Sequence, residues 1–523
     1  MQIPLTPIRF LDRATRLFAR NTAAVCEDSR FTYAEFGERV ERLANALEGL
    51  GVKPGHRVAY MGFNCHRLLE CYYGVLKMGA ILLPLNIRLT TQDFEYILND
   101  AEPVVVFVHP SLIPKLAPIL SSVASVKKYY LLESMDNPPE WVSGEYDTLL
   151  DAASAQQRYS SLNFPFEEND AAELFYTSGT TGPPKGVMLT HRNLYIHALG
   201  LLASMPLWEN DIQLHLIPLF HVNGWGTPHC LTAKGGTHVM LKTFDPARAL
   251  ELIQTEKVTK FYIVPTMMTM LLEFPNLRSI DLSSVRDILI GGAPPPTGMC
   301  AHSETAFDCQ VHGAFGLSET CPVIAYPELY SGLDEATLKH RAHQTWGFPV
   351  IGVEFKVVDP EGNELPWDGE SVGELLVRGD LVMKGYWNKH EATLRALDGG
   401  WFHTGDLVSM GPDGSLIIRD RAKDIIISGG ENISSLEIEQ VLYSHPDILE
   451  CAVIGIKDSK WGEVPKAVVV AKPGSDLTPG EIVEFTRERL AHFKALRSAE
   501  LVEELPKGGS GKILKKKIRE LYG

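Results

Sequence analysis

Short apolar runs of strand length alternate with longer helical patterns between residues 104 and 290. Val104 to Val108 and Tyr129 to Leu132 are two such runs, and a partly helical stretch, Ile113 to Val123, separates them. Pro246 to Thr255 has the start of a helix, because Asp245 can cap it and proline occupies its first position. Further strand candidates are Leu174 to Tyr176, Ile212 to Leu219, Val239 to Leu241, Phe261 to Val264 and Ile288 to Ile290. This alternation predicts an α/β fold with mainly parallel sheets flanked by helices.

The last hundred residues have a different pattern, which predicts a small α+β unit. Ser434 and Glu437 form an S-x-x-E capping box that opens a helix through Leu442. Two strands, Cys451 to Ile456 and Ala467 to Val470, precede a second helix that starts at Thr478-Pro479 and runs to about Ala491. A charged stretch, residues 419–424, separates this unit from the rest. We therefore expect a large N-terminal domain, 1–420, a hinge, 421–424, and a small mobile C-terminal domain, 425–523.

Composition and charge exclude several classes of protein. The 523 residues are 45% apolar and 22% charged, as in globular proteins, and the net charge of −16 argues against a nucleic-acid partner. No apolar run is long enough for a transmembrane helix, and the N-terminus lacks the apolar stretch of a secretory signal. Eight cysteines without a C-x-x-C pair predict neither disulfides nor zinc, and they favour the cytoplasm. The basic tail, Lys512 to Arg519, is expected to be a solvated amphipathic helix.

A loop rich in glycine, serine and threonine carries the strongest chemical signal. It spans residues 176–186, YTSGTTGPPKG, after an apolar strand and before a helix that Thr190 can cap. Its backbone N–H groups and hydroxyls suit a polyphosphate, and Lys185 adds a positive charge. It is not a Walker A loop, because no Gly-Lys-Ser/Thr closes it. A flexible linker would explain neither the lysine nor the preceding strand.

Together with five other segments in order, this loop resembles the signature of the AMP-forming adenylating enzymes, which include the acyl-CoA synthetases. The likeness covers nearly the whole chain. The other segments are Gly291-Gly292-Ala293-Pro294, Gly313-Ala314-Phe315-Gly316-Leu317-Ser318-Glu319-Thr320, Thr404-Gly405-Asp406, Arg421-Ala422-Lys423-Asp424 with Gly429-Gly430-Glu431-Asn432, and Pro506-Lys507-Gly508-Gly509-Ser510-Gly511-Lys512. A single one of these residues, such as Glu319 or Asp406, would be unremarkable alone.

The resemblance implies that the chain activates a carboxylic acid with ATP and Mg²⁺, releases pyrophosphate, and passes the acyl group to coenzyme A. Fixed cations at the α-phosphate would stabilise the charge that gathers in the transition state. Lys512, Glu319 and Thr177 are the implied catalytic residues, and Thr177 and Glu319 the implied Mg²⁺ site. The implied nucleotide-binding residues are Thr177, Ser178, Gly179, Thr180, Thr181, Lys185, Gly292, Ala293, Pro294, Gly313, Ala314, Phe315, Gly316, Thr320, Asp406, Arg421 and Lys512.

The acyl pocket is expected at residues 218–225, together with Gly292. Amino-acid-activating relatives have an aspartate after the phenylalanine, where this chain has His221. Val222, Trp225 and Met299 offer no anionic anchor either, so the far end of the substrate is expected to be uncharged. The His221–Trp225 pair resembles fatty acyl-CoA synthetases, in which the tryptophan gates an acyl tunnel. A packed core tryptophan is the alternative.

The resemblance also implies a coenzyme A site at Ser428, Gly429, Gly430 and Glu431, and rotation of the small domain about Lys423. We expect a medium- or long-chain fatty acid as substrate, and a homodimer is allowed for. Three alternatives stay open: a methylmercaptopropionate or aryl acid ligase, an adenylating enzyme that loads a carrier protein, and a non-catalytic acyl or nucleotide sensor. The retained Lys512 and Glu319 argue against the sensor, because binding alone needs no catalytic lysine.

Overall fold

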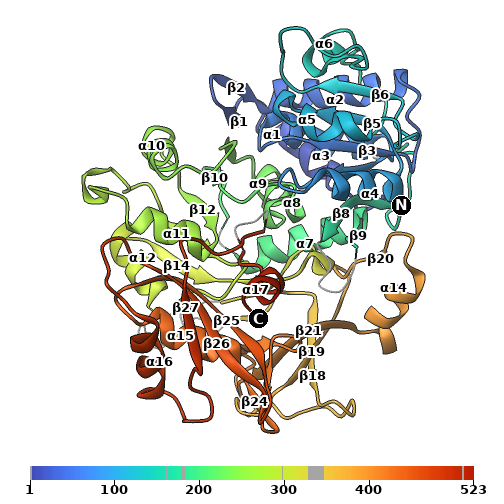
Figure 1. Ribbon diagram of the computed structural model, residues 1–523. Coiled ribbons are helices and arrows are strands. Elements are labelled where there is room, and N and C mark those ends of the chain that lie inside the picture. The colour runs from blue at the N-terminus through green and yellow to red at the C-terminus, as the bar shows by residue number, and fades with distance from the viewer. Residues whose placement is uncertain are drawn as a thin grey trace.

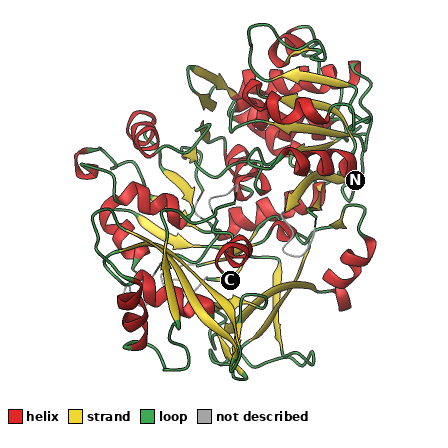
Figure 2. Ribbon diagram, in the orientation of Figure 1, coloured by secondary structure: helices red, strands yellow, loops and turns green. Residues whose placement is uncertain are grey.

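Two large, mostly parallel sheets form the frame of the chain in this computed structural model (Figure 1). The structure describes residues 3–160, 163–177, 183–205, 207–296, 298–327, 347–508 and 512–523. Helices pack around the sheet near the N-terminus, and the C-terminal residues form a group of strands and helices at the opposite end (Figure 2). The predicted α/β class, with a large N-terminal part and a smaller α+β part, is confirmed.

The first large sheet has the strand order β20-β9-β8-β4-β3-β5-β6-β7. Its strands are β3 (Arg57–Met61), β4 (Ile81–Pro84), β5 (Pro103–Val108), β6 (Lys128–Leu131), β7 (Gly144–Glu145), β8 (Ala171–Thr177), β9 (Lys185–Thr190) and β20 (Gly385–Tyr386). Neighbours from β8 to β7 are parallel, whereas β9 and β20 are antiparallel. Val58 and Val106 are fully buried, as expected for strands covered on both faces. The glycine-rich loop joins β8 to β9.

The second large sheet has the order β14-β13-β12-β10-β11-β1-β2, and only β2 is antiparallel to its neighbour. Its strands are β1 (Thr22–Cys26), β2 (Ser29–Thr32), β10 (Ile212–His215), β11 (Thr237–Met240), β12 (Lys260–Ile263), β13 (Asp287–Ile290) and β14 (Gln310–Gly313). The predicted strand Ile212 to Leu219 was too long, because β10 ends at His215. Asn64 there binds the carbonyl oxygen of Ile217 and the N–H group of Leu219, so the backbone leaves the sheet.

The helices of the large domain start at the caps that the sequence predicts. Thr190 accepts a hydrogen bond from the N–H group of Asn193 at 3.0 Å, and Asp245 accepts one from the N–H group of Arg248 at 2.8 Å. The helices are α1 (Ile8–Leu17), α2 (Tyr33–Gly49), α3 (His66–Lys77), α4 (Thr91–Ala101), α5 (Ile113–Leu116), α6 (Tyr146–Asp151), α7 (His191–Ser204), α8 (Val222–Trp225), α9 (Thr227–Lys234), α10 (Pro246–Glu256), α11 (Pro265–Leu272), α12 (Met299–Phe307) and α14 (His390–Ala396).

An antiparallel sheet of order β18-β19-β21-β22 lies between the large sheets and the small domain in sequence, and it was not predicted. Its strands are β18 (Val353–Val358), β19 (Gly373–Gly379), β21 (Phe402–Met410) and β22 (Leu416–Arg421). A smaller antiparallel sheet contains β15 (Phe315–Gly316), β16 (Val323–Tyr326) and β17 (Phe348–Pro349). The expectation of parallel pairing therefore applies to the two large sheets.

The small domain is a sheet of order β24-β23-β26-β25 with β27 parallel to β26. Its elements are β23 (Ile426–Ser428), β24 (Glu431–Ile433), α15 (Ser435–Tyr443), β25 (Ile448–Asp458), β26 (Gly462–Ala471), α16 (Pro479–Arg487), β27 (Ser498–Leu501) and α17 (Lys515–Tyr522). Ile438 of α15 and Val453 of β25 belong to one buried cluster that holds helices to sheet. Figure 1 shows α17 near the middle of the molecule, in front of the sheets.

Three expectations for the small domain need correction. Ser434 caps α15 by accepting from the N–H group of Glu437 at 3.0 Å, but the box is incomplete because the Glu437 carboxylate pairs with Lys494 at 2.8 Å. The second helix, α16, ends at Arg487 instead of reaching Ala491. The tail helix α17 is not simply solvated, since its Lys515 forms an ion pair of 2.8 Å with Glu439.

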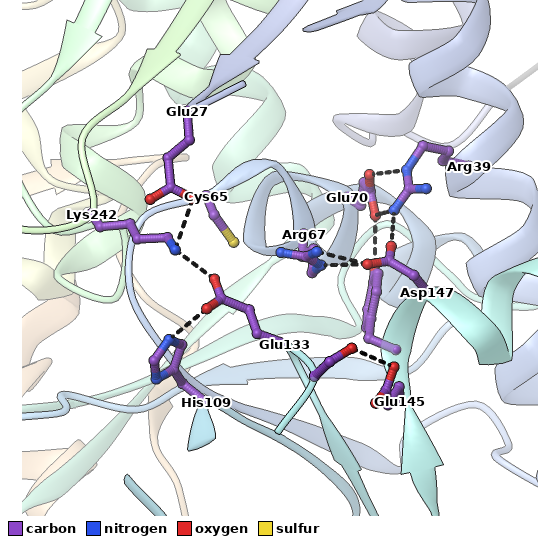
Figure 3. A network of polar contacts seen from close by, with 12 residues as sticks. Glu27, Arg39, Cys65, Arg67, Glu70, His109, Glu133, Glu145, Asp147 and Lys242 are labelled. Carbon is purple, nitrogen blue, oxygen red and sulfur yellow. Dashed lines mark hydrogen bonds and ion pairs between the residues drawn. The ribbon is translucent and has the colours of Figure 1, made fainter. Parts of the chain in front are cut away.

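Ion pairs connect elements that are distant in sequence within the N-terminal part (Figure 3). Lys242, after β11, pairs with Glu133, after β6, at 2.6 Å and so bridges the two large sheets. In a second group, Arg39 contacts Glu70 at 2.6 Å and Asp147 at 2.6 Å. The first group lies after the carboxyl ends of two parallel strands, whereas the second joins the helices α2, α3 and α6. Within the described residues, no helix combines the length and apolar character needed to cross a membrane.

Candidate active site

One cavity of about 310 Å³ brings together residues from both domains. It lies where β8, the loop after β14, the turn after β10 and the segment before the tail helix converge. Of the residues singled out in the sequence, its lining includes Thr177, Lys185, His221, Trp225, Gly292, Ala314, Phe315, Gly316, Glu319, Arg421 and Lys512. Segments more than 300 residues apart in sequence therefore share one site.

The phosphate-loop candidate begins and ends at this cavity. Thr177 is the last residue of β8 and Lys185 is the first of β9, so both side chains are positioned by a strand pair. The Nζ atom of Lys185 lies 4.9 Å from the ring centroid of Tyr386, within cation–π range. Ser178, Gly179, Thr180 and Thr181 lie outside the described residues.

Glu319 presents a carboxylate to the cavity from a short 3₁₀ turn, Ser318–Thr320. Its Oε1 atom accepts a hydrogen bond from the Tyr386 hydroxyl at 2.9 Å, and burial raises the pKa of the carboxyl. Tyr386 therefore contacts both Lys185 and Glu319. No sequence signal pointed to it, because an isolated tyrosine in a two-residue strand belongs to no recognisable pattern.

Thr320 is fully buried and does not line the cavity. Its hydroxyl donates to the carbonyl oxygen of Pro322 at 2.7 Å and accepts from the N–H group of Leu317 at 3.1 Å. The side chain closes a local turn, so the structure does not bring it to where a phosphate could contact it. Ala293, Pro294, Gly313 and Asp406 are also not among the lining residues.

Asp406 lies directly behind the cavity wall, on β21. Its Oδ1 atom forms an ion pair of 2.8 Å with Nε of Arg421, the residue opposite it on β22. Its Oδ2 atom is buried without a hydrogen-bond partner among the described residues, and burial raises the pKa of this carboxyl. Such an acceptor is costly to leave unpaired, and a ligand hydroxyl would satisfy it.

Lys512 is the residue by which the small domain contributes to the cavity lining. It lines the cavity, three residues before the tail helix α17 begins at Lys515. The positive charge of Arg421, together with removal from water, lowers the pKa of Lys512 to about 7. Burial lowers the pKa of His221 to about 4, and Lys512 adds to this effect. The imidazole is therefore neutral near pH 7.

His221 and Trp225 flank one turn, α8, and both line the cavity. The Trp225 indole packs on the backbone after β13, where a Cβ atom on Gly291 would lie 3.1 Å from the ring. Gly292 likewise leaves room for the indole. Trp225 is 6% exposed and lines the cavity, so it is both packed and in contact with the site. Met299 is buried on α12 and is not a lining residue.

The glycine loop of the small domain is not at the cavity. Gly429 and Gly430 are exposed, with φ angles of 61° and 91°, and neither lines the site. Ser428 and Glu431 pair across the same tight turn between β23 and β24. Lys423 is exposed at the junction of the domains. Of the two functional candidates in the small domain, the structure thus presents Lys512 to the cavity and keeps the glycine loop outside it.

Two carboxylates on either side of Lys423 contact the small domain, and the sequence did not reveal their partners. Asp420 accepts from the N–H group of Ser435 at 2.6 Å and from the Ser435 hydroxyl at 2.9 Å, at the start of α15. Asp424 pairs with Arg519 of α17 at 2.6 Å. Asp420 and Asp424 therefore hold this segment against α15 and α17.

Comparison with protein families agrees with this geometry. Residues 11–387 match the AMP-binding enzyme model, and residues 437–512 match the AMP-binding enzyme C-terminal domain. The chain belongs to the AMP-binding enzyme family. The protein is an AMP-forming acid–CoA ligase, as the sequence resemblance implied.

The sequences of several relatives align with nearly the whole of this AMP-binding enzyme. It is 37% identical to a feruloyl-CoA synthase of an Amycolatopsis species, over 98% of both chains. It is 36% identical to a long-chain-fatty-acid–CoA ligase of Thermus thermophilus, over 98% of this chain and 95% of the relative. The solved structure of the anthranilate CoA ligase AuaEII with anthranoyl-AMP has a TM-score of 0.91 at 27% identity, over 100% of this chain and 98% of that one.

Proposed function

We propose that this enzyme activates a medium- or long-chain fatty acid as acyl-AMP and then transfers the acyl group to coenzyme A. The observation that carries the proposal is the composition of the cavity. Lys512, Thr177, Lys185 and Glu319 line the same cavity as His221 and Trp225, and Lys512 is near enough to His221 to affect its pKa. Among the described lining residues Glu319 is the only acidic one, so nothing on the acyl side would hold a substrate ammonium group.

The first half-reaction is attack of the substrate carboxylate on the α-phosphorus of ATP. A new oxygen–phosphorus bond forms while the bond to the pyrophosphate oxygen breaks, and negative charge builds up on the phosphoryl oxygens and on the departing pyrophosphate. Lys512 would bridge the carboxylate and the α-phosphate, while Lys185 would neutralise the departing pyrophosphate. Asp406 would accept the ribose hydroxyls through its unpaired Oδ2 atom, and Arg421 would hold it in place.

The Mg²⁺ proposal rests on the donor set. Thr177 and Glu319 line the same cavity, and one oxygen of Glu319 is free of the Tyr386 contact. A hydroxyl and a carboxylate are hard oxygen ligands, and Mg²⁺ usually takes one or two protein ligands with substrate phosphates and water completing its shell. When bound, the ion would supply positive charge beside the phosphates. The residues present fit this role.

Transfer to coenzyme A requires the thiol to reach the acyl carbonyl. We propose that the small domain turns about Lys423, which withdraws Lys512 and brings Ser428, Gly429, Gly430 and Glu431 to the site. Glycine suits this loop, because a side chain would block close approach of the backbone to the pantetheine. The thiolate then forms the thioester bond and AMP leaves with the bonding electrons.

The choice between fatty and aryl acids is the finer part of the proposal. The fatty acid is favoured by the His221–Trp225 pair, and the aryl acid is the second candidate, since an indole face at the cavity can also stack on an aromatic substrate. Methylmercaptopropionate has an uncharged end and stays an alternative on the same ground. A cytoplasmic location and a homodimeric state stay predictions from the sequence.

The test is an acid panel with two readouts. Propionate, methylmercaptopropionate, octanoate, palmitate, benzoate and ferulate are each supplied with ATP and Mg²⁺, and pyrophosphate release is measured with and without coenzyme A. Highest kcat/KM for octanoate or palmitate, with AMP formation dependent on coenzyme A, supports the proposal. A preference for benzoate or ferulate would replace the fatty acid by the aryl acid. Pyrophosphate release without thioester formation would favour a carrier-protein acceptor, and no release with any acid would favour the sensor.

A further inference from the structure

A left-handed turn of five residues carries the tryptophan of the proposed acyl pocket. Residues 222–226 have φ angles of 42°, 40°, 58°, 68° and 80°, and only Gly224 and Gly226 are glycines. Left-handed backbone is unfavourable for residues with a Cβ atom, most of all for a β-branched one such as Val222. A run of this kind persists only where its surroundings hold it in place.

A fully buried carboxylate supplies the polar contact that holds this turn. The Oε2 atom of Glu173 accepts a hydrogen bond from Nδ2 of Asn223 at 2.9 Å. Its Oε1 atom lies 3.3 Å from Nε2 of His229, in the first turn of α9. Glu173 and Asn223 are both 0% exposed. A buried carboxylate is tolerated only when it is paired in this way, so it fixes the groups that surround it.

The position of Glu173 links two parts of the site. It is on β8, four residues before Thr177, and its own neighbours in the sheet are Leu82 on β4 and Leu189 on β9. Asn223 lies midway between His221 and Trp225. One hydrogen bond thus connects the strand that ends in the phosphate loop to the turn that presents the acyl-pocket side chains.

We propose that Glu173 is a positioning residue that determines acid specificity by holding the turn at residues 222–226 through Asn223. The proposal rests on the proposed function, because it takes the face of Trp225 at the cavity to be part of the acyl site. Loss of the bond would let the turn relax towards ordinary backbone angles and move the indole. ATP binding would be spared, because Lys185, Glu319 and Arg421 are carried by other elements.

The experiment exchanges the donor and the acceptor of the hydrogen bond between Asn223 and Glu173. Asn223→Asp sets a second carboxylate against Glu173, and aspartate tolerates positive φ nearly as well as asparagine, so the backbone preference is kept. Glu173→Gln preserves the shape, and its new amide can donate to Asn223 Oδ1, which has no hydrogen-bond partner among the described residues. The double variant Glu173→Gln/Asn223→Asp restores a donor facing an acceptor. Tyr33→Phe removes a remote buried hydrogen bond, to the carbonyl oxygen of Gly236 at 2.6 Å, and is the matched control.

For each variant, kcat/KM is measured for octanoate, palmitate and benzoate, together with KM for ATP. We expect Asn223→Asp to change the ratio between acids by about tenfold, the size of effect typical of one charged hydrogen bond, with KM for ATP unchanged. Glu173→Gln and the double variant should keep the wild-type ratio, and Tyr33→Phe should do so as well. A uniform loss of rate for all acids in Asn223→Asp, or no recovery in the double variant, would overturn the inference. Failure of the proposed function is distinguishable, because it would appear in the wild-type enzyme itself, as a preference for benzoate, as release of pyrophosphate without thioester, or as no use of any acid.

Discussion

Asp406 and Arg421 face each other across the antiparallel strands β21 and β22, and their side chains pair at 2.8 Å. The pair uses one carboxylate oxygen and leaves the other buried without a partner among the described residues. Arg421 also lines the cavity and is the main cause of the lowered pKa of Lys512. One arginine therefore affects both a ribose-binding candidate and the lysine from the small domain.

The first prediction concerns ATP use. Asp406→Ala should raise KM for ATP by tenfold or more. A hydrogen bond to a carboxylate contributes ~1.5–3 kcal/mol, and the variant would lose its hydrogen bonds to two ribose hydroxyls. Steady-state kinetics at saturating acid measures the effect. Asp398→Ala, at an exposed carboxylate of the same domain, is the control and should leave KM unchanged. Wild-type KM for ATP in Asp406→Ala would refute the ribose assignment.

The second prediction separates the two half-reactions. Lys512→Ala should nearly abolish acyl-adenylate formation, yet convert supplied acyl-adenylate and coenzyme A to thioester at a substantial rate. Gly430→Leu should do the reverse, because a side chain would obstruct the approach of the pantetheine. Single-turnover measurements of each half report the result, with Lys516→Ala, an exposed neighbour in α17, as the control. Equal damage to both halves in both variants would show that the domains do not alternate.

The third prediction tests the pivot. Lys423→Pro should slow the switch between half-reactions, because proline restricts φ at the position that must absorb the rotation. Each half-reaction measured alone should be less affected than the full cycle. Comparison of single-turnover rates with steady-state kcat gives the answer, and an unchanged kcat would place the pivot elsewhere.

The fourth prediction concerns chain length. Trp225→Ala should change the order of preference among acids more than it changes KM for ATP, because the indole lines the cavity against Gly291 and Gly292. The measurement is kcat/KM over a series of saturated acids. Trp367→Ala removes a partly exposed tryptophan away from the cavity and controls for general loss of aromatic packing. An unaltered profile would leave Trp225 with a packing role only.

The fifth prediction follows from the lowered pKa of Lys512. The ammonium form needed at the phosphate exists below its pKa of about 7 and is lost as the pH rises through that value. We expect kcat/KM for adenylate formation, which reports the free enzyme, to fall above about pH 7. Lys512→Arg should keep its charge and remove this descending limb. A profile that is flat from pH 6 to 9 in the wild-type enzyme would contradict the assignment.

The two large sheets were predictable because their strands are buried on both faces. Runs such as Val104 to Val108 are therefore almost wholly apolar and stand out from the helical patterns. In Val353–Val358, the first strand of the sheet β18-β19-β21-β22, polar and apolar residues alternate as in a half-buried strand, but the run is only six residues long. Short patterns of this kind resemble those of loops, so this sheet was missed.

The candidate site was predictable only where its residues belong to motifs. Lys185, Glu319 and Lys512 occur in recognisable segments, and the structure brings all three to one cavity. Tyr386 and Asp420 act through partners that are distant in sequence, Glu319 and Ser435, so no local spacing reveals them. For the same reason the sequence predicts a solvated helix for the basic tail, whereas Arg519 is paired with Asp424.

Lys512 lies at the cavity and the Gly429-Gly430 loop lies outside it, so the two groups would act one after the other. The two groups belong to the same small domain, so if this domain turns as proposed, each turnover would contain two large displacements through solvent. The viscosity of the solvent would then limit the rate of these displacements. Overall turnover would slow as the viscosity of the medium rises, whereas the rate of either half-reaction, measured alone, would not change.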